Sequence, residues 1–296
     1  MILRQTRDLG DKISATVQYI RTHLKDLVSL YLVFVVPISL VAVLLGSNAF
    51  SSIFQVVQAK DFLSDPYKLL NPMLGVTILL YFMSAASYAT VINLHMRVVD
   101  ELPERTSYFN EVASRFIPKF LTNLLYVIAL MVLLVASVFI ALIPILGGIA
   151  LFVGWFYAFF TLSLMVPVNT MENLPFPQAI ARAFRLIRGE FWASVGYLLI
   201  LGLIYYLFSM IVSTIVSAVF GITSINFIKP DPGQFSNRYF MVTGFAGVIS
   251  QVFNLILLVG VGMLFFSLRE QKEGGGLESR IETLGSGGSN LPEEQY

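Results

Sequence analysis

The sequence predicts an all-α, polytopic membrane protein with six transmembrane helices and both termini in the cytoplasm. Of its 296 residues, 56% are hydrophobic and only 12% are charged, whereas a soluble domain is usually about 25% charged. Residues 120–171 contain no Asp, Glu, Lys, Arg or His. Since roughly 20 apolar residues cross a bilayer as one helix, this block holds two spans. A PILGG break at residues 144–148 makes it a predicted transmembrane hairpin.

Five blocks without charges hold the six predicted spans. We place them at about residues 27–46, 73–93, 120–142, 149–170, 191–221 and 241–266. An interfacial helix is expected at residues 1–26, the membrane domain at 27–268 and a cytoplasmic tail at 269–296. The tail should be a short helix followed by a flexible acidic end. Pro37 and Pro167 fall inside spans, where neighbouring helices can supply the lost hydrogen bonds.

The distribution of basic residues predicts the orientation. Of the 19 Lys and Arg residues, 15 lie in the two termini and in the loops after the second and fourth spans. The opposite face carries the remaining 4, which are Lys60, Lys68, Lys229 and Arg238. Cytoplasmic loops of membrane proteins carry an excess of Lys and Arg. We therefore expect both termini to be cytoplasmic.

Each cytoplasmic segment that precedes an odd-numbered span has the pattern of an amphipathic helix. The first places Leu9, Ile13, Val17, Ile20 and Leu24 on one face. Its expected N-cap is Asp11, and similar faces recur at residues 109–116 and 176–191. Such helices lie in the headgroup plane with the apolar side down. The pattern predicts three pseudo-repeats of interfacial helix plus helical hairpin; the alternative is that any helix entering a membrane begins with such an elbow.

Two segments resemble a known family. They are residues 179–192 (AIARAFRLIRGEFW) and residues 265–274 (FFSLREQKEG), the latter followed by Leu277 and Glu278. Both resemble bacterial six-helix integral membrane proteins related to the membrane domain of glycerophosphodiester phosphodiesterases, and the chain is most similar to Bacteroidota-type members. Ala183 stands where Ser is common in that family, and Ser267 where Asp is usual. The resemblance implies a bacterial inner membrane, no catalytic residues and, as a possible partner, a cytoplasmic MoxR-type ATPase system.

The residue types present give little support to catalysis. There is no Cys, which excludes thiolate chemistry and disulfides. His23 and His95 are both expected at the cytoplasmic edge, and a two-His metal site would need further carboxylates. No acidic or basic residue falls inside a predicted span, where proton relays and ion-coupled transporters usually keep one. We expect no enzyme, no cofactor, no metal and, from a net charge of +1, no nucleic-acid partner.

Three groups of residues are candidates for binding or packing. Small residues four apart let helices approach closely, either within the bundle or between subunits. Polar residues inside spans either line an interior path or form interhelical hydrogen bonds. Cations on the elbows are expected to contact anionic headgroups, at about 1 kcal/mol each. The groups are Ser209, Ser213, Ser217 and Gly221 for packing, Asn169, Gln251 and Asn254 for a polar interior, and Arg182, Arg185, Arg188, Arg21 and Lys25 for headgroups.

Two functions compete on this basis. The leading hypothesis is a non-enzymatic scaffold or partner subunit of a membrane assembly, held by lipids and other integral subunits. Its rival is a transporter or lipid-handling protein that uses the bundle interior. A scaffold needs a dry bundle and an exposed packing surface or a docking tail, and the alternative for the tail is a solvated segment. A transporter needs a cavity at membrane depth lined by Asn169, Gln251 and Asn254.

Overall fold

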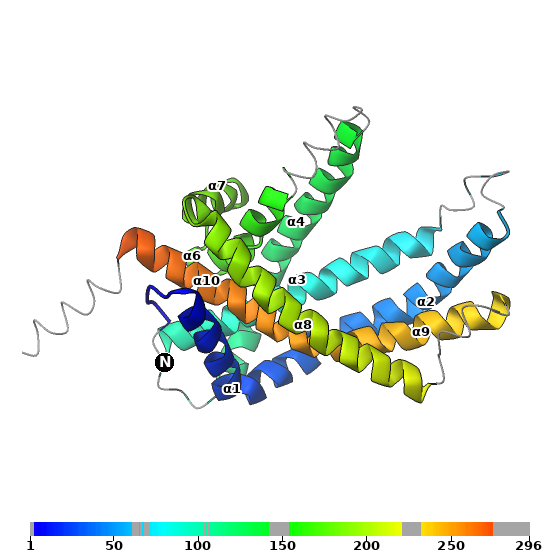
Figure 1. Ribbon diagram of the computed structural model, residues 1–296, viewed down its shortest axis with the longest axis horizontal. Helices are drawn as coiled ribbons and strands as arrows, with labels where there is room; N and C mark the ends of the chain where they lie inside the picture. The colour runs from blue at the N-terminus through cyan, green and yellow to red at the C-terminus, as the bar shows by residue number, and fades with distance from the viewer. Residues whose placement is uncertain are drawn as a thin grey trace, which may run out of the picture.

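The structure of the protein is a computed structural model. It describes residues 3–60, 65, 67, 71–103, 105, 107–141, 154, 156–220 and 232–274. All long elements in these ranges are helices, which fan out from one compact end (Figure 1). By length and composition, four of the described helical segments can cross a membrane: Val36–Val57, Pro72–Glu101, Phe191–Val219 and Asn237–Glu273. The all-helical class and the membrane helices are confirmed, while the count of six stays a prediction.

The first predicted span is divided between two helices. α1 covers Leu9–Phe34, α2 covers Val36–Gln58, and the break falls at Val35. Pro37 is the second residue of α2 and cannot donate a backbone hydrogen bond, so the helical ladder is interrupted there. The expected N-cap Asp11 is wrong, because the Asp8 side chain accepts the Asp11 amide at 2.7 Å and caps α1.

The middle of the chain contributes α3 (Pro72–Glu101), α4 (Phe109–Ala141) and α6 (Met165–Glu172). A hydrogen bond connects the start of α4 to α1, because the Asp26 carboxylate of α1 accepts the Tyr108 amide at 3.0 Å. α6 ends at Asn173, which adopts the left-handed conformation at φ 55°. The PILGG break lies outside the described residues, so the hairpin of the third and fourth spans stays a prediction.

The three amphipathic segments join the helices that follow them in different ways. α7 (Phe176–Ile187) is a separate helix, and α8 (Phe191–Val219) begins after a turn at Gly189. That residue has a φ of 90°, a conformation open to glycine and strained for other residues. The second segment instead continues through Pro118 into one long helix, α4. The first continues through a kink at His23. Among the described residues, only the third segment is a separate helix joined to the following helix by a turn. The threefold repeat therefore stays a prediction.

The last predicted span is also two helices. α9 covers Pro232–Ser250, a 3-10 turn (η4) covers Gln251–Asn254, and α10 covers Leu255–Glu273. α2 packs on α3 and α9, whereas α8 packs on α9 and α10. α10 also packs on α1 and α3 and contacts α6 and α7. The 3-10 turn thus lies in the middle of the bundle (Figure 1).

Glycines permit the closest helix approaches. A Cβ at Gly244 on α9 would lie 2.7 Å from Val43 Cγ1 and 3.3 Å from its Cβ on α2. A Cβ at Gly260 on α10 would lie 2.1 Å from Leu201 Cδ1 on α8. Small residues of this kind bring helix backbones together in membranes.

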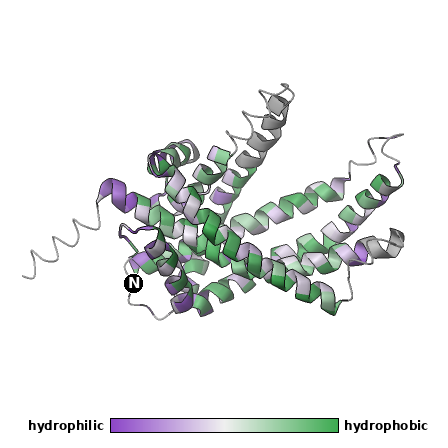
Figure 2. Ribbon diagram, viewed as in Figure 1, coloured by the Kyte–Doolittle hydropathy of each residue, from purple (hydrophilic) through white to green (hydrophobic). Residues whose placement is uncertain are grey.

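One end of the molecule is polar, and noncovalent contacts between distant segments hold it together. Figure 2 shows hydrophilic residues where α1 begins and α10 ends. Ion pairs connect the segments there: Arg4 to Asp100 at 2.7 Å, Arg115 to Glu101 at 2.6 Å and Arg182 to Glu172 at 2.9 Å. The basic segments of the sequence therefore gather at one end, and the apolar helices extend from it.

Gly244→Ala should destabilise the protein, because Val43 is β-branched and its Cβ cannot move away from the added methyl. We expect a loss of about 1–3 kcal/mol, typical of overpacking. Gly247→Ala is the matched control on the same helix, since its Cβ meets nothing within 4 Å. Thermal unfolding in mild detergent measures both. Equal melting temperatures for the two variants would contradict the close contact of α2 and α9.

Candidate functional site

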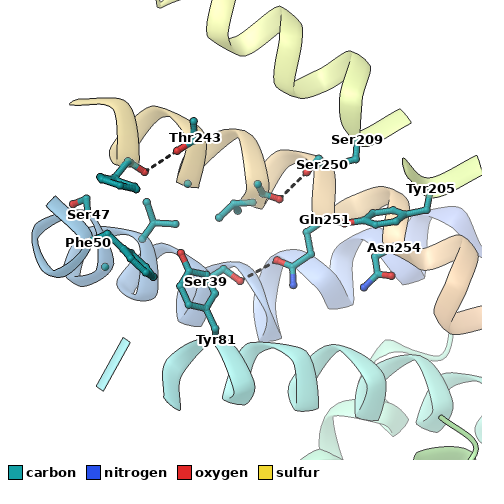
Figure 3. A pocket seen from close by; sticks show the side chains of 16 residues that line it. Ser39, Ser47, Phe50, Tyr81, Tyr205, Ser209, Thr243, Ser250, Gln251 and Asn254 are labelled. Atoms are coloured by element: carbon teal, nitrogen blue, oxygen red, sulfur yellow. Dashed lines mark hydrogen bonds between the residues drawn. The ribbon is translucent and has the colours of Figure 1, made fainter. Parts of the chain in front are cut away.

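A cavity of about 580 Å³ lies among the apolar helices at the level of the 3-10 turn. α2, α3, α8 and α9 contribute its walls (Figure 3). Its polar lining comprises Ser39, Ser47, Tyr81, Tyr205, Ser209, Thr243, Ser250, Gln251 and Asn254. Val43, Phe50, Phe240 and Val248 supply apolar wall. The cavity therefore combines uncharged polar groups with an apolar lining.

The 3-10 turn places two amides on this wall. Side chains three residues apart eclipse one another in a 3-10 helix, so Gln251 and Asn254 share a face. Ser39 donates to Gln251 Oε1 at 3.1 Å and hydrogen-bonds Ser84 at 2.6 Å. No group in the described part of the chain hydrogen-bonds the side chain of Asn254, which lines the cavity. One amide is thus held by the protein, and the other is available to a ligand.

Hydroxyl groups satisfy backbone carbonyls at both helix breaks. Tyr31 donates to the Val248 carbonyl, and Tyr88 donates to the Val252 carbonyl at 3.3 Å. The two tyrosine rings pack with centroids 5.0 Å apart. At the other break, Ser87 donates to the Phe34 carbonyl at 2.7 Å. Irregular backbone at membrane depth requires such donors, because lipid supplies none.

The cavity lining has no Asp, Glu, Lys, Arg or His among the described residues. A charged ligand group would therefore find no counter-ion at this depth, where an unpaired charge is costly. Hydroxyls and amides can bind an uncharged polar group by hydrogen bonds, and the aromatic and aliphatic walls can cover a hydrocarbon chain.

Asn169 does not line the cavity beside the 3-10 turn. It is buried between α6 and α4, where its amide donates to Asn123 Oδ1 at 2.7 Å. Asn123 in turn donates to Thr90 at 2.9 Å. Lys119 binds the Asn169 carbonyl at 3.2 Å, close to the polar end. The three residues predicted to form one polar interior are therefore divided: Gln251 and Asn254 line the cavity, and Asn169 joins two helices.

The serine stripe of α8 faces the bundle. Ser209 lines the cavity, and Ser213 and Ser217 are half-buried on the same side. Gly221 lies outside the described residues. The opposite face of α8 exposes large apolar side chains, among them Leu203, Tyr206, Met210, Ile211 and Ile215.

The elbow cations differ in how they are held. Arg182 is bound by Glu172 at 2.9 and 3.0 Å and also by Glu273, which connects α6, α7 and α10. Its pKa is raised mainly by the hydrogen bond to Glu172. The side chains of Arg185, Arg188, Arg21 and Lys25 are exposed. Arg182 therefore forms ion pairs within the protein, whereas the other four side chains are accessible to lipid headgroups.

The two histidines meet in an aromatic cluster that the sequence did not reveal. Their ring centroids are 5.2 Å apart, and Tyr108 packs on both. His95 is fully buried and its Nδ1 hydrogen-bonds the Tyr19 hydroxyl at 2.7 Å. Burial lowers the pKa of His23. Within the described ranges no group of three or more His, Cys, Asp or Glu could hold a metal ion.

Comparison with known proteins gives no assignment: no protein-family model, no curated protein and no solved structure matches the chain. The function must therefore be argued from the geometry of the molecule.

Tyr31→Phe removes the donor to the Val248 carbonyl at the 3-10 break. We expect a loss of about 0.6–1.7 kcal/mol, the range of interhelical hydrogen bonds in membranes. Tyr81→Phe is the control, because its hydroxyl lines the cavity and makes no hydrogen bond within the described chain. Unfolding in detergent compares the two variants, and an unchanged Tyr31→Phe protein would argue against a role for this donor.

Proposed function

We propose that the protein is a lipid-handling or transport protein that holds an amphiphile with an uncharged polar head inside its helix bundle. The observation that supports this best is the cavity beside the 3-10 turn, on whose wall the Asn254 amide makes no hydrogen bond to the described residues. Gln251, fixed by Ser39, would offer its remaining hydrogen-bonding capacity to the same head. The apolar walls would receive the hydrocarbon part.

The helix breaks favour handling over a purely structural role. A 3-10 segment inside a long helix often marks a hinge, and here it forms the cavity wall. The break between α1 and α2 lies nearby, because Tyr31 of α1 reaches the Val248 carbonyl of α9. Movement of α9 relative to α10 would change the cavity without breaking either helix.

We further propose six spans in the inner membrane of a bacterium, with both termini cytoplasmic. The gathering of the basic segments at one end supports this orientation. The exposed face of α1, which includes Leu9, Val17 and Leu24, supports an interfacial position for this helix. We also propose a relation to the membrane domain of glycerophosphodiester phosphodiesterases, for which the two motifs at residues 179–192 and 265–274 are the support.

A second candidate function is a scaffold or partner subunit of a membrane assembly. The exposed apolar face of α8 supports it, because only 6% of the most apolar 18-residue window of this helix is buried within the protein. Other integral subunits, and a MoxR-type ATPase system on the cytoplasmic side, would be its partners. Stoichiometric co-migrating proteins in a mild-detergent preparation would favour this candidate over the amphiphile proposal.

Gly247→Phe should displace the amphiphile, because Gly247 lines the cavity and its Cβ would enter open space. We expect at least about a fivefold loss of co-purifying ligand, equivalent to about 1 kcal/mol. Mass spectrometry of the protein purified from native membrane measures it. Gly202→Phe on α8 is the control, since it also has open space but lies outside the cavity lining. Equal ligand in the two variants, or none in the parent, would contradict the proposal.

Single cysteines test the orientation, because the sequence has none of its own. Ala59→Cys at the end of α2 and Gln18→Cys on α1 are both exposed positions. A membrane-impermeant maleimide should label Ala59→Cys in spheroplasts and Gln18→Cys only after permeabilisation. The reverse pattern would overturn the proposed orientation.

A further inference from the structure

A second cavity, of about 310 Å³, opens at the polar end of the molecule. It lies where the start of α1, the start of α8 and the end of α10 meet, well apart from the cavity beside the 3-10 turn. Its lining includes Arg7, Lys12, Glu190, Ala193, Ser267 and Gln271. Asp8 also lines it, so basic, acidic, hydroxyl and amide groups all face this open cavity.

Lys12 is the unusual member of this group. It is 7% exposed, and its ammonium has no hydrogen bond or ion pair to any residue that the structure describes. Burial lowers the pKa of Lys12, while the charges of Glu190 and Asp8 oppose this shift. A buried ammonium whose donors meet no acceptor is costly, so the cavity that it lines presents unused hydrogen-bond donors.

The two nearby carboxylates are engaged elsewhere. Glu190 accepts the Gln271 side-chain amide at 2.9 Å. Asp8 accepts the Asp11 amide at 2.7 Å as the N-cap of α1. Neither forms an ion pair with Lys12, so the ammonium donors have no acceptor among the described residues, although both carboxylates place negative charge near them.

The N-terminal end of α8 also favours an anion at this cavity. Gly189 turns the chain between α7 and α8 at φ 90°, and Glu190 at the N-cap makes no side-chain hydrogen bond to the first turn. Ala193 of that first turn lines the cavity. The amides at the N-terminus of a long helix carry partial positive charge and favour anions. α8 is 29 residues long, so its N-terminal field adds to that of the buried cation.

We propose that this cavity binds the phosphate group of an anionic ligand, held by the Lys12 ammonium and the first turn of α8. The phosphate belongs either to a lipid headgroup or to a free phosphate compound, since both present the same oxygens. Ser267 and Gln271 would donate further hydrogen bonds. This site is separate from the proposed amphiphile cavity, and neither proposal depends on the other.

The test uses the full-length protein and three variants. Lys12→Gln removes the charge, Lys12→Arg keeps it, and Lys60→Gln removes an exposed charge just after α2, far from the cavity. Native mass spectrometry measures retained phosphatidylglycerol against phosphatidylcholine after delipidation and reconstitution. In parallel, thermal unfolding measures stabilisation by inorganic phosphate against chloride at equal ionic strength.

We expect Lys12→Gln to retain about tenfold less phosphatidylglycerol, in keeping with the loss of a charge-assisted hydrogen bond. Lys60→Gln and Lys12→Arg should behave like the parent. If the dependence on Lys12 appears with inorganic phosphate and not with lipid, the ligand is a free phosphate compound. Equal retention and equal stabilisation in Lys12→Gln and Lys60→Gln would overturn the proposal. A Lys12→Gln protein that melts early yet binds both ligands like the parent would also overturn it.

Discussion

The structure depends on one constraint: a helix that breaks at membrane depth must find new donors for its backbone carbonyls. The break at Val35 uses Ser87, and the break at the 3-10 turn uses Tyr31 and Tyr88. These three hydroxyls come from α1 and α3, so the same bonds that satisfy the breaks also hold the bundle together. Hydrocarbon offers no substitute for them.

The breaks also create the space in which function is proposed. Side chains three residues apart share a face in an α-helix and eclipse one another in a 3-10 helix, so the 3-10 turn aligns Gln251 and Asn254 closely along the cavity wall. The glycine at position 244 lets α2 and α9 approach closely and also lines the cavity, while at Gly247 of the same helix a Cβ would meet nothing within 4 Å. Close packing and open space therefore alternate along a single helix.

At the polar end, ion pairs rather than hydroxyl–carbonyl hydrogen bonds connect the helices. There, charges are abundant and paired across helices, as with Arg182 between Glu172 and Glu273. Lys12 stands out because it is buried without a partner in the described chain. An anionic headgroup at this level would lie at the membrane surface, while an uncharged head would lie deeper beside the 3-10 turn. The two cavities thus suit different chemistry at different depths.

The sequence predicted the helical class and the membrane character, because both follow from composition and from the length of uncharged blocks. It also predicted that Gln251 and Asn254 share a face, since a spacing of three serves α and 3-10 helices alike. It could not place Asn169 apart from them, because that division is set by packing between distant helices. The pairing of His23 with His95 was equally hidden, since 72 positions separate them in the chain.

The most direct test of the account is cryo-electron microscopy of the protein in nanodiscs made from native membrane lipid. The account predicts an elongated density in the cavity between α2, α8 and α9, with its head against Gln251 and Asn254. A cavity closed by direct packing of these helices, or one that holds only water, would contradict it.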